Sequence, residues 1–134
     1  MQYQVDVIKT GTFGAVPGPE LFWMSHWGEW RPLDTLAVVI RGGGKTVLVN
    51  TGAPLDLLPT MNASWRKIFG RDDVDLTVKE DEKIENALAK VGVKPADVDV
   101  VIVTPFQAYA IGGVDKFPKA RLCLSRRGWI DFHA

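Results

Sequence analysis

The residues best placed for chemistry lie in one stretch, VIVTPFQAYAIGGVDKFP at positions 101–118. An apolar run stops abruptly and a glycine pair follows, which is typical of a strand that ends at the mouth of a site. Gln107 and Tyr109 could hydrogen-bond a polar substrate there, whereas the side chains of Pro105 and Ala110 have no donor atom. A neutral amide oxygen is a weak metal ligand, and a phenol must first lose a proton with a pKa of about 10. The stretch therefore predicts a pocket mouth without metal ligands.

The other residues that could do chemistry do not stand at a recognisable motif spacing in the sequence. His26 and His133 are the only histidines, and neither has a second metal donor at a motif spacing, so we expect both to be structural or surface residues. Asp99 and Asp115 stand where turns are expected, and turn capping explains them better than an acid–base pair. Ser125 has no evident base beside it in the sequence, so a serine nucleophile is unsupported.

Cysteine and glycine patterns exclude further classes of site. Cys123 is the only cysteine, which rules out a disulfide within the chain and a four-cysteine metal site, and the alternation of ARLCLS predicts a buried structural thiol in a strand. The segment RGGGKT ends like a phosphate-binding loop but lacks the first glycine of that motif and a helix after it. A tight hairpin turn explains it better, so no cofactor is expected.

Five apolar, β-branched runs predict the strands that must position these residues. The two runs on either side of RGGGK are expected to pair as an antiparallel hairpin, because glycine takes the positive φ of a tight turn. The run VDVVIV is nearly continuous in apolar residues, which predicts a central strand buried on both faces. The five runs are YQVDVIKTG, TLAVVIRG, KTVLVNTG, VDVVIVT and ARLCLS.

One helix is predicted with clear signals, and a second is weaker. In EDEKIENALAKVG the apolar residues Ile84, Leu88 and Val91 recur at helical spacing, acidic residues crowd the first turn, and Gly92 can end the helix. The segment DLLPTMNASWRKIFG is expected to hold a short helix beginning near Asn62 or Ser64. The polar segment RDDVDLTVKEDE between the two is interpreted as a surface connection.

Tryptophan is concentrated in PGPELFWMSHWGEWRP, where Trp23, Trp27 and Trp30 are spaced so that a helix would place them on one face. Such a stripe would either pack on the chain's own core or form a partner surface, because tryptophan is enriched where chains bury large apolar areas against each other. Trp129 near the other end of the sequence is a further candidate interface residue.

Composition places the chain among ordinary globular proteins. The 134 residues are 46% hydrophobic and 24% charged, which suits a single α/β domain over residues 1–134. The 16 basic and 16 acidic residues balance to a formal charge of zero, so we expect neither nucleic acid nor a membrane surface as a partner. The opening MQYQVDVIKT lacks the features of a secretory signal, and the expected location is the cytoplasm.

The order of these motifs resembles the N-terminal half of the metallo-β-lactamase superfamily, and especially its lactonase-like branch. TLAVVIRGGGKTVLVNTGAP resembles the family's hairpin that ends in Asp-Thr-Gly. VKPADVDVVIVTPFQAYAIGGVDKFPKARLCLSRRGW resembles the segment around the family's His-x-His-x-Asp-His metal motif, including its Gly-Gly and Phe-Pro. The resemblance implies an αββα half-fold, with a mixed or antiparallel sheet and flanking helices.

Carried over position by position, the metal motif of the family is degenerate in this chain. The hairpin aspartate corresponds to Asn50, and the motif histidines and aspartate correspond to Pro105, Gln107, Tyr109 and Ala110. Zinc needs imidazole, thiolate or carboxylate donors arranged around the ion. The resemblance therefore implies a scaffold that has lost its metal ligands.

Members of the superfamily repeat the β-rich half, and the second half supplies the other sheet of a sandwich. One face of the sheet in this chain is therefore expected to lie bare. Exposed apolar surface costs about 25 cal/mol per Å² against a total stability of about 5–15 kcal/mol, so we expect another polypeptide or a second copy to cover it. A fold-back of the Trp-rich segment is the remaining alternative.

Three hypotheses for function follow. The first is a non-catalytic subunit, a structural or regulatory partner of another chain that is itself an enzyme. The second is a hydrolase subunit whose active site, lined by Gln107, Tyr109 and Asn50, is completed by a partner chain. The third is a small-molecule binding module that uses the vacated pocket without a reaction. The sequence alone leaves all three open.

Overall fold

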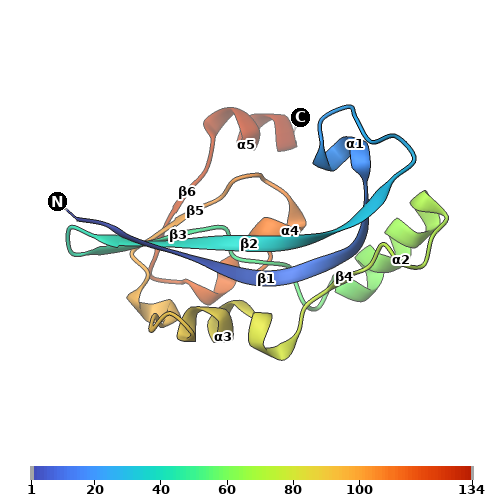
Figure 1. The fold of residues 1–134 in the computed structure, drawn as a ribbon. Helices are drawn as coiled ribbons and strands as arrows, with labels where there is room; N and C mark the ends of the chain where they lie inside the picture. Colours follow the sequence, from blue (N-terminus) through green and yellow to red (C-terminus); the bar gives the residue numbers. More distant parts are fainter. Residues whose placement is uncertain (1, 134) are drawn as a thin grey trace.

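A six-stranded mixed sheet organises the chain in the computed structural model, which describes residues 2–133 (Figure 1). The strand order is β4-β1-β2-β3-β5-β6, in which β4 to β3 pair antiparallel while β5 and β6 continue parallel to β3. The strands are β1 Gln4–Pro17, β2 Trp30–Gly42, β3 Lys45–Val49, β4 Leu76–Thr77, β5 Val100–Ile102 and β6 Arg121–Cys123. The predicted mixed sheet with flanking helices is confirmed.

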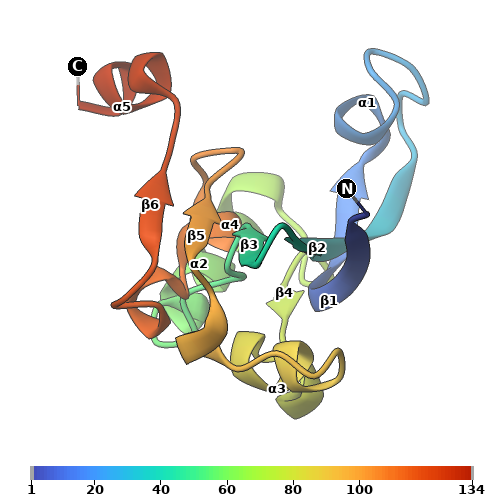
Figure 2. The same ribbon diagram turned by 90° about the vertical axis from the view of Figure 1, so that its left-hand side faces the viewer.

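Short helices connect the strands. The α-helices are α1 Gly18–Leu21, α2 Leu58–Phe69, α3 Ile84–Ala89, α4 Ala108–Ile111 and α5 Arg126–His133, and the 3₁₀ turns are η1 Glu80–Glu82, η2 Pro95–Asp97 and η3 Val114–Lys116. α1 and α5 rise on one side of the sheet and α3 lies on the other (Figure 2). Within residues 2–133, none of the helices is both long and apolar enough to cross a lipid bilayer.

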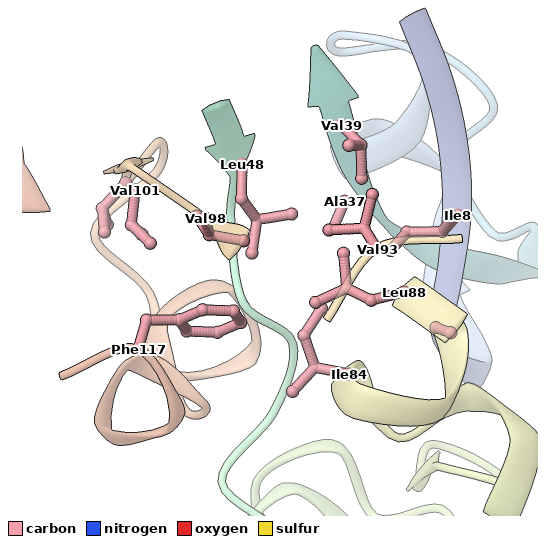
Figure 3. Packing of buried hydrophobic residues seen from close by; sticks show 12 residues of the cluster. Ile8, Ala37, Val39, Leu48, Ile84, Leu88, Val93, Val98, Val101 and Phe117 are labelled. Carbon is pink, nitrogen blue, oxygen red and sulfur yellow. The ribbon is translucent and has the colours of Figure 1, made fainter. Parts of the chain in front are cut away.

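The hydrophobic core lies between α3 and one face of the sheet. Leu88 of α3 lies beneath Ala37 and Ile8, while Phe117 fills the space under the parallel strands (Figure 3). Leu88, Ala37 and Leu48 are fully buried. The helical spacing of Ile84 and Leu88 in the sequence is what places both on the face toward the sheet.

The opposite face of the sheet is mainly apolar and open, and its register also places Lys9 and Arg121 on it. Directly paired residues on neighbouring strands point to the same side, so the strand register defines this face. Val5, Val7 and Leu36 on it are 59%, 60% and 49% exposed. We call it the open face: Val5, Val7, Leu36, Val38, Ile40, Val47, Val49, Val100, Ile102 and Cys123.

This open face corrects the prediction for the strand VDVVIV. Val101 points to the core and is 1% exposed, as expected, but its neighbour Ile102 points to the open face and is 36% exposed. β5 is central in the sheet, between β3 and β6, yet buried on one side only. Cys123, on the adjacent edge strand, is likewise half-buried rather than buried.

The hairpin predicted from RGGGK is confirmed. β2 and β3 pair antiparallel, and Gly43 and Gly44 between them have φ of 59° and 73°. Positive φ at both central residues of a two-residue turn matches the right-handed twist of the flanking strands. The strand expected to stop at Gly11 instead continues to Pro17 past a register shift, and β2 begins earlier than expected, at Trp30.

The two predicted helices form with altered boundaries. α3 ends before Gly92, which has the expected positive φ of 71°, and its acidic first turn is the separate 3₁₀ turn η1. α2 begins at Leu58 and ends at Phe69, with Gly70 as its left-handed C-cap. The connection between them was wrongly interpreted as surface: it contains β4, where Leu76 is 1% exposed and exchanges two hydrogen bonds with the Asn62 side chain.

The Trp-rich segment does not form the helix that would align its tryptophans. α1 ends at Leu21, and Trp23, Met24 and His26 all adopt positive φ in the loop that follows. Trp27 lies in the same loop, and Trp30 is the first residue of β2. The spacing of the three residues therefore has no helical meaning.

Candidate functional site

The candidate site lies where β3 and β5 end side by side. Asn50 follows β3 with a φ of 66°, and its backbone N–H donates to the carbonyl of Ile102 at 2.8 Å. Its side-chain Oδ1 accepts the backbone N–H of Thr104 at 2.8 Å. Asparagine tolerates the left-handed region better than most residues. Asn50 thus joins the ends of both strands and uses its side-chain oxygen to do so.

Thr51 continues this connection into the loop after β5. Its N–H donates to the Ala110 carbonyl at 2.7 Å, and its hydroxyl donates to the same carbonyl at 3.2 Å. The hydroxyl oxygen also accepts the N–H of Gly113 at 3.2 Å. Thr51 and Ala110 are 1% and 2% exposed, so these contacts are shielded from water.

The glycine pair is required by close backbone packing. The N–H of Gly112 donates to the carbonyl of Gly52 at 2.8 Å, and a Cβ on Gly112 would lie 1.9 Å from the nitrogen of Pro54. A Cβ on Gly113 would lie 2.5 Å from the Thr51 carbonyl oxygen. The absence of side chains at Gly112 and Gly113 therefore allows the loop after β5 to pack directly against the loop after β3.

Gln107 and Tyr109 line a cavity of about 220 Å³ beside this loop. The Tyr109 ring meets Phe13 edge-on at 5.7 Å between ring centroids. Burial raises the pKa of the Tyr109 phenol above its ordinary value of 10, and the negative charge of Glu20 raises that pKa further. At neutral pH Tyr109 is therefore an uncharged hydroxyl that can donate or accept a hydrogen bond.

No protein-family model matches the sequence, and no curated protein sequence is similar enough to count as a match. The fold is similar to that of solved hydrolases. One is an N-acyl homoserine lactone hydrolase with its product N-hexanoyl-L-homoserine bound at the catalytic metal centre, at 18% identity and a TM-score of 0.80, covering 100% of this chain and 53% of that one.

Two more solved structures agree with the first. A variant of AiiA from B. thuringiensis with N-decanoyl-L-homoserine bound at its active site has 17% identity and a TM-score of 0.80, with coverage of 100% and 53%. A probable metal-dependent hydrolase from Staphylococcus aureus has 19% identity and a TM-score of 0.66, with coverage of 99% and 51%. The chain has a metallo-β-lactamase-like half-fold. This chain spans about half the length of these solved chains.

The residues at the motif positions do not fit the metal that this metallo-β-lactamase-like fold implies. The Asn50 oxygen is engaged by a backbone N–H, Ala110 is buried without a donor, and Tyr109 is held in its neutral form. Pro105 is exposed and has no donor, and Gln107 offers only a neutral amide. Between residues 2 and 133, no group of three His, Cys, Asp or Glu side chains is arranged to hold a metal ion.

The remaining polar candidates have local structural contacts. Asp99 accepts the Thr46 backbone N–H at 2.8 Å and pairs with Lys45 at 2.6 Å, and both bonds lower the pKa of its carboxyl, the Lys45 bond more. Asp115 lies in η3, with its carboxylate 3.7 Å from the ammonium of Lys116. Neither carboxylate is placed against the cavity of Gln107 and Tyr109.

His26, Ser125 and His133 are also placed by their neighbours. The His26 ring packs at a tilt against the Phe22 ring, with 4.4 Å between ring centroids, and its Nδ1 lies within hydrogen-bond distance of the Ser25 hydroxyl. The Ser125 hydroxyl accepts the N–H of Gly128 at the start of α5. The His133 ring lies at 4.3 Å from Trp129, between ring centroids.

The four candidate interface tryptophans differ in exposure. Trp23 and Trp27 are 88% and 69% exposed in the loop after α1. Trp30 packs instead against Phe69 at 5.5 Å, with the Arg71 guanidinium 4.5 Å above its ring. Trp129 on α5 is half-exposed and meets the ring of Phe106 at 6.1 Å.

Sequence reasoning missed the other walls of the cavity, which come from distant parts of the chain. Phe13 of β1, Glu20 of α1, and Trp65 and Phe69 of α2 all line it. The spacing of Trp65 and Phe69 at i and i+4 within a helix was the available signal. Phe13 and Glu20 had none, because only the long β1–β2 hairpin brings them to α4.

Proposed function

We propose that this chain is a non-catalytic, metal-free metallo-β-lactamase-like subunit that acts as a structural or regulatory partner of another polypeptide, one with enzymatic activity. The observation that carries the proposal is the use of the motif positions. The side-chain oxygen of Asn50 and the carbonyl of Ala110 accept hydrogen bonds that join the loop after β3 to the loop after β5. Backbone hydrogen bonds stabilise the same connection.

The open face supports the partner role. It presents ten apolar side chains over five adjacent strands, and several of them are about half exposed. Large contiguous apolar patches on soluble proteins mark surfaces that another molecule covers. The polypeptide that covers it is proposed to be the chain with which this subunit works.

Metal analysis of the purified protein, alone and with any chain that accompanies it, is the direct test. The proposal predicts no stoichiometric metal on this chain, and a thermal midpoint that a strong chelator leaves unchanged. Stoichiometric zinc or iron bound through the loop at Pro105 to Ala110, with a lower midpoint after chelation, would overturn it.

A second candidate is a hydrolase subunit whose site is completed by a partner chain. It draws support from Gln107 and Tyr109, whose side chains line the cavity next to the strand ends. Replacing Tyr109 by Phe together with Gln107 by Ala should then abolish turnover by the assembly. Unchanged rates in an assembly of normal mass would reject this candidate.

A further inference from the structure

The cavity that contains Gln107 and Tyr109 is walled by aromatic rings. Four of its lining residues are Phe13, Trp65, Phe69 and Tyr109, contributed by β1, α2 and α4. Its volume of about 220 Å³ suits a small molecule or one end of a larger one. Phe13, Trp65 and Tyr109 are each only half-buried, so their rings keep surface that a ligand could cover.

The rings are fixed at steep angles to one another. Phe13 and Tyr109 stand at 85°, with their centroids 5.7 Å apart, and Phe13 and Trp65 stand at 58° and 5.1 Å. Adjacent rings at such angles form a corner rather than a flat stack. The negatively polarised face of each aromatic ring attracts a cation placed above it.

The charge around the cavity has one sign. Among the described residues that line it, Glu20 alone is charged. Arg66 and Arg71, which are close in sequence to the lining residues Trp65 and Phe69, are each paired with an aspartate. Arg66 binds the Asp75 carboxylate at 2.9 Å, and Arg71 binds Asp73 at 2.6 Å while lying over Trp30. The charge of Glu20 also contributes to raising the pKa of the Tyr109 phenol, so its field reaches the aromatic corner.

We propose that this cavity binds a small molecule through a methylated ammonium group, held against Trp65, Phe13 and Tyr109 with Glu20 as its counter-charge. The inference concerns the cavity alone, and it names a ligand class for the binding-module hypothesis drawn from the sequence. It holds whether or not a partner covers the open face, because no open-face residue lines the cavity.

The degree of methylation follows from the lining, in which only three of the twelve side chains have an acceptor, and all three would have to converge on one primary ammonium to satisfy it. A primary ammonium has three N–H donors that must all find acceptors when it leaves water. The cavity offers the Glu20 carboxylate, the Gln107 amide and the Tyr109 hydroxyl, with aromatic and aliphatic carbon elsewhere. A trimethylammonium group has no N–H to satisfy and presents methyl groups to the rings, which suits this lining.

The experiment compares choline with 3,3-dimethylbutan-1-ol, a neutral molecule of the same shape in which carbon replaces the charged nitrogen. Both are titrated into the full chain by calorimetry. Choline should bind roughly 3- to 30-fold more tightly than the neutral alcohol, the range expected for a cation over aromatic rings. Equal affinities, or no measurable binding of choline, would overturn the proposal.

Variants separate the charge from the rings. Glu20→Gln should weaken choline binding by about 3-fold or more while leaving the neutral alcohol unaffected, and Trp65→Leu should weaken both. Glu85→Gln and Trp129→Leu, a matched acidic and aromatic pair outside the cavity, should bind choline as the unmodified chain does. Glu20 is exposed, so its variant folds even if Trp65→Leu does not, and unchanged choline affinity in Glu20→Gln would contradict the counter-charge.

Discussion

Asn50 combines a left-handed backbone, with φ of 66°, and a side-chain oxygen that accepts the N–H of Thr104. The two properties make different demands on a replacement. Aspartate keeps an acceptor, glycine keeps the backbone freedom, and alanine keeps neither. Substitutions at this one residue can therefore separate hydrogen bonding from backbone strain.

Asn50→Ala is expected to lower the free energy of unfolding by about 1–3 kcal/mol, because it removes the acceptor for the Thr104 N–H and because alanine tolerates positive φ less well than asparagine. Asn50→Gly should cost less, since only the hydrogen bond is lost, and Asn50→Asp should cost least. Urea denaturation of the three variants measures the order. An alanine variant as stable as the unmodified chain would contradict the role given to Asn50.

At the scale of elements, Asp99 holds the beginnings of two parallel strands together. It precedes β5, and its carboxylate binds the Lys45 ammonium and the Thr46 backbone N–H at the start of β3. These bonds favour the ionised form, so the pKa of Asp99 in the folded chain lies below its ordinary value of 3.8. A depressed carboxyl pKa stabilises the fold above the unfolded pKa.

Asp99→Asn should therefore destabilise the chain at pH 6, and the difference from the unmodified chain should shrink as the pH falls below about 4 through the lowered pKa. Urea midpoints measured from pH 6 to pH 2.5 give this comparison. A difference that stayed constant over that range would mean that the Asp99 charge contributes nothing.

The two loops at the strand ends depend on the absence of a side chain at Gly112. Gly112→Ala would force a Cβ against the backbone of Ala53 and Pro54, and is expected to lower the free energy of unfolding by at least about 1–3 kcal/mol. Gly128→Ala in α5 is the matched control, because its Cβ would meet only ordinary contacts, and alanine in a helix gains about 0.5–1 kcal/mol. Equal effects of both substitutions on thermal unfolding would exclude the packing argument.

The elements were predicted from the sequence where the signal is local. Gly43 and Gly44 define a hairpin, and Ile84 and Leu88 define a helix, through patterns that neighbouring residues complete. β4 was missed because Leu76 and Thr77 form too short a strand to leave a pattern, and its pairing with β1 depends on residues far away in the chain.

At the scale of the whole molecule, the open face is the feature that most needs another molecule. A standard protein interface covers about 800 Å² on each partner, roughly a tenth of the 8481 Å² of accessible surface on this chain. Helix α5, which contains Trp129, and the loop after α1 rise on the same side of the sheet (Figure 2). A partner bound to the open face would therefore contact aromatic side chains at the edges of that face.

Leu36→Lys on the open face should leave folding intact, because the side chain is already half-exposed, but it should release the polypeptide that covers the sheet. Ile68→Lys on α2, which replaces an exposed apolar residue outside the open face, is the control and should keep that polypeptide bound. Co-purification of each variant from the source measures the difference. Retention by Leu36→Lys equal to that of the control would place the partner elsewhere.

The site was only partly predictable. That the side chains of Pro105 and Ala110 offer no metal donor can be read from the sequence, because it depends on residue type alone. The exposure of Ile102 and the grouping of Phe13, Glu20 and Trp65 around one cavity depend on register shifts and on the course of a long hairpin. A pattern within a few residues contains no information on either.

Native mass spectrometry of the protein isolated from its source tests the central claim most directly, because a single spectrum reports both bound polypeptide and bound metal. We expect a particle heavier than one 134-residue chain, with the extra mass due to polypeptide and no metal ion on this chain. A lone chain carrying one or two metal ions would contradict this expectation.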